Sequence, residues 1–353
     1  MRRCGRCLMP ENYPDADIGV SGECRFCRDY DKTDLEKLER ERLERERDLE
    51  ETLRNCRGRG RYDCLVLLSG GKDSAYLLYK LKVEYGLRVL ALSTDAGGYM
   101  GDVALKNLRT TLGKISVDHI MYTPSKDFYK KLFTFLLKNQ IKEGAVKTVC
   151  YVCHPLTEAY ALDLAVSEGI PLILEGFSPG QPDPEAMLYE MPKRHIMEDN
   201  WTPKAVRESG LFSKEELAHF WDPMAYPKNT QFPRILAPFH AWRYDQAEIM
   251  KKVVELGLIS SKKSADPVHS NCLMNWVMMY SDIRNLGYNP YLFEFARLIR
   301  EGKADKRHWA VMDRIVNFML RHRIFLGRRV SYMLKDLDLK TEDLRITGRD
   351  KKR

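Results

Sequence analysis

The stretch LLSGGKDSAYLLYKL, residues 67–81, changes character at its centre. Its first residues end a continuous apolar run that is typical of a buried strand, and its last residues have the spacing of an amphipathic helix. Gly70 and Gly71 lie at the junction. Glycine lets a backbone bend tightly and approach a ligand without a Cβ in the way. The stretch therefore predicts a strand, a glycine turn and a helix whose first turn faces a bound group.

The first turn of this helix has the composition of a phosphate site. A helix N-terminus offers unpaired amide hydrogens and the positive end of the helix dipole, which together bind phosphate. The residues that we expect to hold the phosphates are Ser69, Gly70, Gly71, Lys72, Asp73 and Ser74. Asp73, an acid among phosphate binders, is best explained as a Mg²⁺ contact or a partner of the helix dipole. A plain strand-to-helix turn is the alternative.

The same alternation of strand and helix patterns continues through the middle of the chain. Strands are expected at 62–69, 88–95, 119–124 and 171–178, with helices at 73–86, 101–114, 128–143 and 155–169. Continuous apolar strands separated by amphipathic helices pair in parallel through crossovers. The sequence predicts an open, doubly wound α/β sheet whose ligand site lies beyond the carboxyl ends of its strands.

Composition divides the chain into five segments. They are a cysteine-paired segment at 1–30, a charged linker helix at 31–60, the nucleotide-binding α/β domain at 61–180, an irregular insertion or lid at 181–244, and a helical C-terminal portion with a basic tail at 245–353. Aromatic residues of the insertion, including Trp201, Phe220 and Trp221, suit either stacking on an acceptor or packing of the lid.

Four cysteines near the N-terminus have the spacing of a metal site. Cys4 and Cys7, then Cys24 and Cys27, form two C-x2-C pairs with sixteen residues between them. This pattern is typical of a tetrahedral, four-thiolate zinc site. The metal would supply the folding energy that a segment so poor in apolar residues lacks. Two redox pairs are the alternative, but they leave the folding of this segment unexplained.

A third C-x2-C pair, Cys150 and Cys153, lies on the ligand side of the predicted sheet, just before an expected helix. Cys272 is the one further thiol available as a partner, with His154 and His269 as weaker candidates. Three cysteines with one position open suit an iron–sulfur cluster that binds an exogenous ligand at its fourth iron. The alternatives are unrelated buried thiols, or a zinc site completed by a histidine.

Over residues 62–180 the SGGKDS loop resembles the PP-loop of the ATP-pyrophosphatase superfamily. Members of this superfamily hold the pyrophosphate end of ATP in the loop and transfer AMP to a carbonyl oxygen. The resemblance implies further ATP contacts at later strand ends, from Ser93, Thr94, Asp95, Glu175 and Gly176. Asp95 also suits a role as cap of the next helix.

The layout of zinc ribbon, PP-loop, C-x2-C and distant cysteine resembles the iron–sulfur-dependent tRNA thiolation enzymes. This resemblance implies that Cys150, Cys153 and Cys272 bind the cluster, and that Lys72, Asp73, Cys150 and Cys153 are catalytic. The expected reaction adenylates a carbonyl oxygen of the acceptor, a tRNA base, and replaces that oxygen with sulfur from a donor. Adenylation matters because a carbonyl oxygen is a poor leaving group. This sequence has no second, C-terminal zinc ribbon of the kind found in those enzymes, which counts against docking of tRNA.

Residues 1–95 are also similar to the N-acetyl sugar amidotransferases of surface-polysaccharide and flagellin-sugar pathways. Those enzymes use the same activation but install nitrogen, with ammonia from a partner glutaminase, so the acceptor would be a nucleotide-linked sugar. The middle C-x2-C pair is unexplained by this alternative. A protein that only binds ATP is a third hypothesis, which the complete SGGKDS loop disfavours.

Composition limits the class of partner and the location. The formal net charge is +8, which favours an anionic partner such as nucleic acid or a nucleotide. No run of about 18 apolar residues and no signal peptide occur, so a cytoplasmic protein with no membrane partner is expected. The sequence is compatible with a homodimer and does not specify the oligomeric state.

Overall fold

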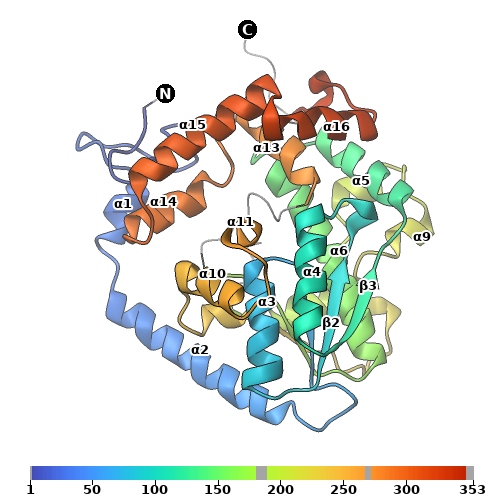
Figure 1. Cartoon of the computed structure of the whole chain (residues 1–353). Coiled ribbons are helices and arrows are strands. Elements are labelled where there is room, and N and C mark those ends of the chain that lie inside the picture. The colour runs from blue at the N-terminus through green and yellow to red at the C-terminus, as the bar shows by residue number, and fades with distance from the viewer. Residues whose placement is uncertain (1, 180–188, 267–271, 347–353) are drawn as a thin grey trace.

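A computed structural model of the chain describes residues 2–179, 189–266 and 272–346 (Figure 1). Within these ranges the centre of the fold is a parallel sheet of five strands in the order β3-β2-β1-β4-β5. The strands are β1 (Cys64–Leu67), β2 (Val89–Thr94), β3 (Asp118–Tyr122), β4 (Leu172–Leu174) and β5 (Arg234–Leu236). The strand order changes direction between β1 and β4, where doubly wound sheets bind ligands. The predicted doubly wound α/β fold is confirmed.

Alternate residues of the central strand pack against helices on opposite faces of the sheet. Val66 of β1 shares a core with Leu77 of α3 (Lys72–Tyr79). Its neighbour Leu65 shares a different core with Leu162 of α6 (Ala145–Ser167). All four residues of β1 are buried, which explains why its sequence is continuously apolar. The other helices around the sheet are α4 (Asp102–Lys114), α5 (Lys126–Lys138), α10 (Gln246–Glu255) and α11 (Lys262–Ala265).

Helix α6 begins ten residues before the expected position, so Cys150 and Cys153 lie inside it rather than before it. Pro155, which indicated a helix start, is an interior residue of α6. A proline inside a helix removes one backbone hydrogen bond and costs stability. The earlier turns persist because their apolar residues, including Val149, enter the core, and because the Asp282 carboxylate accepts hydrogen bonds from the backbone amides of Ala145 and Val146.

The insertion contains a strand that the sequence did not predict. After α7 (Lys193–Glu198), α8 (Lys204–Glu208) and α9 (Lys214–Leu217), the chain forms β5, which pairs in parallel with β4. Trp201, Phe220 and Trp221 are all buried. Trp201 and Trp221 share a core with the sheet, and Phe220 shares the core of α5 and α6, so none of them presents an aromatic surface to an acceptor.

The C-terminal portion is helical, as expected. After α10 and α11 it contains α13 (Met274–Asn285), α14 (Leu292–Arg300), α15 (Lys306–His322) and α16 (Arg328–Asp336). Helices α13, α15 and α16 share one core with α5 and α6. Residues 347–353 and His269 lie outside the described ranges. No helix in the described part of the chain is long and apolar enough to cross a membrane.

The N-terminal segment folds onto the C-terminal helices, with α1 (Arg25–Tyr30) beside α14, while α2 (Leu35–Asn55) leads away to the sheet (Figure 1). The rings of Tyr13 and Phe293 stack with centroids 5.6 Å apart. Arg3 forms an ion pair of 2.8 Å with the buried carboxylate of Asp313. The first and last parts of the sequence therefore form one structural unit.

Candidate active site

The glycine turn after β1 comes very close to another part of the backbone, at α4. Gly70 has a φ of +80°, and a Cβ on it would lie 2.4 Å from the carbonyl oxygen of Ala104 in α4. Gly71 has an ordinary φ of −82° and is the N-cap of α3. The turn is therefore pressed against α4, and only its second glycine has space for a side chain.

Two serine hydroxyls fix the turn to the first residues of α3. The Ser69 and Ser74 Oγ atoms lie 3.1 Å apart, and Ser74 Oγ accepts from the Ser69 amide at 3.2 Å. The Gly71 amide donates to Ser69 Oγ at 3.3 Å. The loop is thus held in shape by its own side chains.

Lys72 and Asp73 form a buried ion pair on the first turn of α3. Lys72 Nζ lies 2.6 Å from Asp73 Oδ2, and the two side chains are 4% and 10% exposed. The hydroxyl of Tyr244 donates to the other carboxylate oxygen of Asp73 at 3.1 Å. The ammonium that would contact a phosphate and the carboxylate that would contact Mg²⁺ are therefore adjacent.

At the end of β2, the side chains of Ser93 and Asp95 are held by hydrogen bonds within the described part of the fold, and that of Thr94 is not. Ser93 Oγ donates to the carbonyl of Leu68 and lies 2.9 Å from His119 Nε2. Thr94 Oγ1 is buried and has no hydrogen-bond partner among the described residues. Asp95 does not cap α4; its Oδ1 accepts from the Met100 amide at 2.8 Å and closes the intervening loop. Thr94 is thus the hydroxyl that this strand end leaves available.

The end of β4 lies directly against the phosphate loop. A Cβ on Gly176 would lie 2.9 Å from the backbone nitrogen of Ser74. The preceding residue, Glu175, is 1% exposed, and its Oε1 has no hydrogen-bond partner among the described residues. The structure therefore brings Glu175 and Gly176 beside α3, as their positions at a strand end indicated.

Glu175 belongs to a buried cluster with two residues of α6. His154 Nε2 lies 3.3 Å from Glu158 Oε1 and 3.4 Å from Glu175 Oε2. Burial lowers the pKa of His154, but the two carboxylates outweigh it and hold that pKa well above its usual value. Burial raises the pKa of Glu175 to about 7. Sequence reasoning missed Glu158, because its i,i+4 spacing from His154 is significant only on a helix that begins before Pro155.

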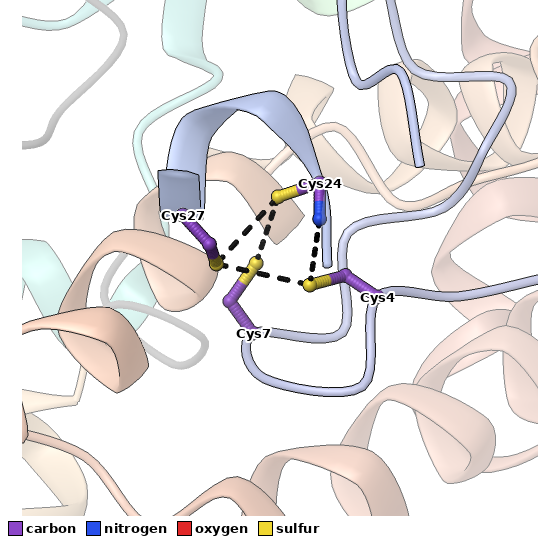
Figure 2. Close-up of side chains that lie close together, drawn as sticks. All are labelled: Cys4, Cys7, Cys24 and Cys27. Carbon is purple, nitrogen blue, oxygen red and sulfur yellow. Dashed lines mark hydrogen bonds between the residues drawn. The ribbon is translucent and has the colours of Figure 1, made fainter. Parts of the chain in front are cut away.

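The four N-terminal cysteines converge on one point, with Cys24 and Cys27 at the start of α1 and Cys4 and Cys7 on the facing loop (Figure 2). The Sγ atoms lie 3.7 Å apart for Cys4 and Cys27, 3.5 Å for Cys7 and Cys24, and 3.6 Å for Cys24 and Cys27. A tetrahedral ion with bonds of about 2.3 Å to sulfur separates its ligands by about 3.8 Å. The group is compatible with a zinc ribbon.

Cys150 and Cys153 of α6 lie near enough to Cys272, two residues before α13, for Cys272 to affect both thiols. Burial raises the pKa of all three thiols, and proximity to Cys272 raises the pKa of Cys150 and Cys153 further. Cys272 is nevertheless exposed to solvent. The group of three thiols is therefore accessible from the side on which Cys272 lies.

The spacing of these three thiols differs from that of a site for a single ion. Two groups of potential ligands in the described residues have all their ligand atoms within 4.8 Å of one another, and the three thiols are not among them. A polynuclear cluster binds each thiolate to a different iron atom, which spreads the sulfur atoms further apart. Within the described residues the three thiols therefore do not form a site of single-ion size.

Sequence reasoning missed three other residues near the loop. Asn107 of α4 donates to the carbonyls of Gly70 and Ser264, at 2.9 and 2.8 Å. Glu294 of α14 is close enough to Lys72 for the ammonium to oppose the rise that burial causes in its pKa, which is about 7. The third is Tyr244, which no motif marked. Each comes from a separate element, and only the fold brings them to the loop.

No family model matches the chain. In sequence it is 30% identical to the argininosuccinate synthase of Geobacter sulfurreducens over 114 residues, which are 32% of this chain and 27% of that protein. It is 26% identical to the same enzyme of a Geobacter species over 186 residues, 52% of this chain and 43% of the relative. The chain thus covers less than half of the length of these curated relatives. Argininosuccinate synthases are PP-loop proteins, so the matches confirm the resemblance at the level of that superfamily.

An uncharacterized protein of Methanocaldococcus jannaschii is 24% identical over 261 residues, 74% of this chain and 76% of that protein. Solved structures that resemble the chain include NMN synthetase from Francisella tularensis, with 11% identity, 89% and 98% of the two chains covered and a TM-score of 0.37. Another is a U34-tRNA thiolase from Methanococcus maripaludis with its 4Fe–4S cluster, with 14% identity, 99% and 92% covered and a TM-score of 0.35. These scores are too low to carry an argument about function.

Proposed function

We propose that this PP-loop protein uses ATP to adenylate a carbonyl oxygen of an anionic acceptor and then replaces that oxygen with sulfur. The first step joins the carbonyl oxygen to the α-phosphorus of ATP and releases pyrophosphate. In the second step a sulfur nucleophile from a donor attacks the same carbon, and AMP leaves with the original oxygen. The net charge of +8 suits a polyanionic acceptor, for which a tRNA base is our first candidate.

The adenylation step is supported by the loop between β1 and α3. The two glycines let the backbone at the start of α3 come close to pyrophosphate, and Lys72 supplies positive charge beside it. Asp73 would exchange its contact with Lys72 for Mg²⁺ when the nucleotide binds. The ends of β2 and β4 would bind the rest of ATP, through Thr94 and Glu175.

The observation that carries the choice of sulfur is the approach of Cys272 to Cys150 and Cys153. When bound, an iron–sulfur cluster on these thiols would supply an open iron that holds the exogenous sulfur. The exposure of Cys272 leaves a side of this site accessible to a sulfur donor. We also propose that Cys4, Cys7, Cys24 and Cys27 bind one structural Zn²⁺, since their closed four-thiolate geometry leaves no position for chemistry.

The test of the cluster is anaerobic purification with iron, sulfide and absorption measurements. We expect about four irons per chain in the native protein, and loss of iron and of thiolation in Cys272→Ser. Cys56→Ser is the matched control, because Cys56 is a buried thiol at the end of α2. An iron-free native protein with full turnover in Cys150→Ser would overturn the cluster.

The same preparation distinguishes the alternative functions. Nitrogen transfer to a nucleotide-linked sugar, with ammonia or a glutaminase as donor, would identify the amidotransferase that residues 1–95 resemble. No pyrophosphate with either tRNA or nucleotide-sugar acceptors would leave a protein that only binds ATP. Pyrophosphate release is therefore measured first, because both enzymatic functions require it.

A further inference from the structure

Helix α6 carries a second group of potential metal ligands beyond its two cysteines. His154 Nε2 and one carboxylate oxygen each of Glu158 and Glu175 all lie within 4.8 Å of one another. Two of the three residues are one helical turn apart on α6, and the third follows β4. The fold thus assembles one imidazole and two carboxylates from two elements of the α/β domain.

The two carboxylates have fewer partners than their burial requires. Glu158 is 3% exposed and Glu175 is 1% exposed, and the Oε1 atom of each has no hydrogen-bond partner among the described residues. Within those residues the ion pairs of both end at the same imidazole, that of His154. Burying a carboxylate is costly unless it is paired and hydrogen-bonded. The His154 imidazole carries at most one positive charge, which cannot balance two buried carboxylates. The cluster therefore lacks positive charge.

The donor types indicate which charge would complete the cluster. Imidazole nitrogen and carboxylate oxygen together suit Mn²⁺, Fe²⁺ or Zn²⁺, whereas thiolates select softer ions and clusters. His154 is 31% exposed at its side chain, so the group has one open side through which an ion can enter. A bound cation would also let Glu175 Oε1, which has no hydrogen-bond partner among the described residues, act as a ligand.

We propose that His154, Glu158 and Glu175 form a binding site for a divalent first-row transition-metal ion, separate from both cysteine groups. The site lies at the carboxyl end of β4, where the next residue, Gly176, contacts the first turn of α3. An ion there is beside the phosphate loop. The inference goes beyond the proposed reaction but shares Glu175 with the expected ATP contacts, so its test uses protein without nucleotide.

Mn²⁺ binding to the nucleotide-free full-length chain, measured by electron paramagnetic resonance, tests this site. Mn²⁺ is a hard ion that prefers oxygen and nitrogen to thiolate, so the cysteine groups compete poorly for it. We expect one bound Mn²⁺ per chain, with affinity lowered at least about tenfold in Glu158→Gln and in Glu175→Gln. Binding should persist in Asp73→Asn, which separates the site from the phosphate loop.

The matched control is the double variant His195→Gln and Asp199→Asn. His195 and Asp199 form another i,i+4 pair of 2.9 Å, on the exposed surface of α7, and their loss should leave Mn²⁺ binding unchanged. The native protein should also show a ¹⁴N coupling from imidazole in its pulsed spectrum, which decides the question even if a glutamate variant fails to fold. Absence of a Mn²⁺ site, absence of that coupling, or native affinity in both glutamine variants would overturn the proposal.

Discussion

Gly70 lies so close to Ala104 that a Cβ on the glycine would be 2.4 Å from the alanine carbonyl oxygen. This contact presses the phosphate loop against α4 and fixes where the loop amides point. Gly70 also has a φ of +80°, a region that costs other residues roughly 1–2 kcal/mol. The loop therefore depends on glycine for two separate physical reasons.

We predict that Gly70→Ala lowers the free energy of unfolding by more than about 2 kcal/mol, because strain and a backbone clash add. Gly71→Ala is the control, since Gly71 has an ordinary φ and its nearest neighbour, Ser69 Oγ, would be 3.4 Å from a new Cβ. Urea unfolding of the two variants is the measurement. Equal losses of stability would mean that the contact with Ala104 does not constrain the loop.

The Lys72 and Asp73 pair predicts non-additive effects on stability. Removing one member of a buried ion pair leaves the other charge uncompensated, which typically costs about 3–5 kcal/mol. We expect Lys72→Met and Asp73→Asn each to destabilise the chain, and the double variant to be more stable than the sum of the two predicts. All three should abolish pyrophosphate release. A double-mutant cycle in urea, combined with that assay, checks both points, and turnover in either single variant would mean that the loop has another role.

Local patterns predicted most of the fold, because they follow directly from burial. The strand β1 is continuously apolar since both its faces are covered, and α3 begins where the glycines end. The strand β5 could not be predicted, because three residues inside an irregular insertion become a strand only by pairing with β4. The start of α6 was misjudged for a related reason: tertiary packing and the Asp282 cap outweigh the local preference of Pro155.

The site was predictable where its residues are contiguous in sequence or directly follow a predicted strand. Six neighbouring residues form the phosphate loop, and cysteine spacing marks the ribbon. The contacts of Asn107, Tyr244 and Glu294 with the loop arise from α4, a loop before α10 and α14. No local pattern distinguishes these residues from other polar residues, because their partners are set by the packing of distant elements.

Metal removal from the ribbon is predicted to affect the whole chain. Cys4, Cys7, Cys24 and Cys27 share a small core with Ala296 of α14, and the same helix carries Glu294 toward Lys72. We expect chelation, or Cys24→Ser, to remove about one zinc per chain, to lower the melting temperature and to weaken ATP binding through α14.

Cys64→Ala is a control for the loss of a buried thiol, since Cys64 lies inside β1, away from the ribbon. It should retain zinc and ATP binding, even if it lowers stability. Zinc analysis, thermal melting and a nucleotide-binding titration on the same samples are the measurements. A zinc-free chain that melts and binds ATP like the native protein would show that the ribbon is an independent appendage.

Stability should fall in mild acid because of His240, a residue that packs between the sheet and α2. Burial, with help from Arg297 and Arg45, lowers the pKa of His240 to about 4, and its Nε2 has no hydrogen-bond partner among the described residues. Protonation therefore favours the unfolded chain, in which the pKa is about 6.5. The stabilising contribution of neutral His240 is complete above pH 6.5 and is lost as the pH falls toward 4, up to about 3 kcal/mol by linkage.

We expect His240→Gln to flatten the profile of unfolding free energy against pH in this window. The control is His308→Gln, at an exposed position, which should leave the profile unchanged. Parallel profiles for His240→Gln and the native protein would exclude His240 as the cause of the acid sensitivity.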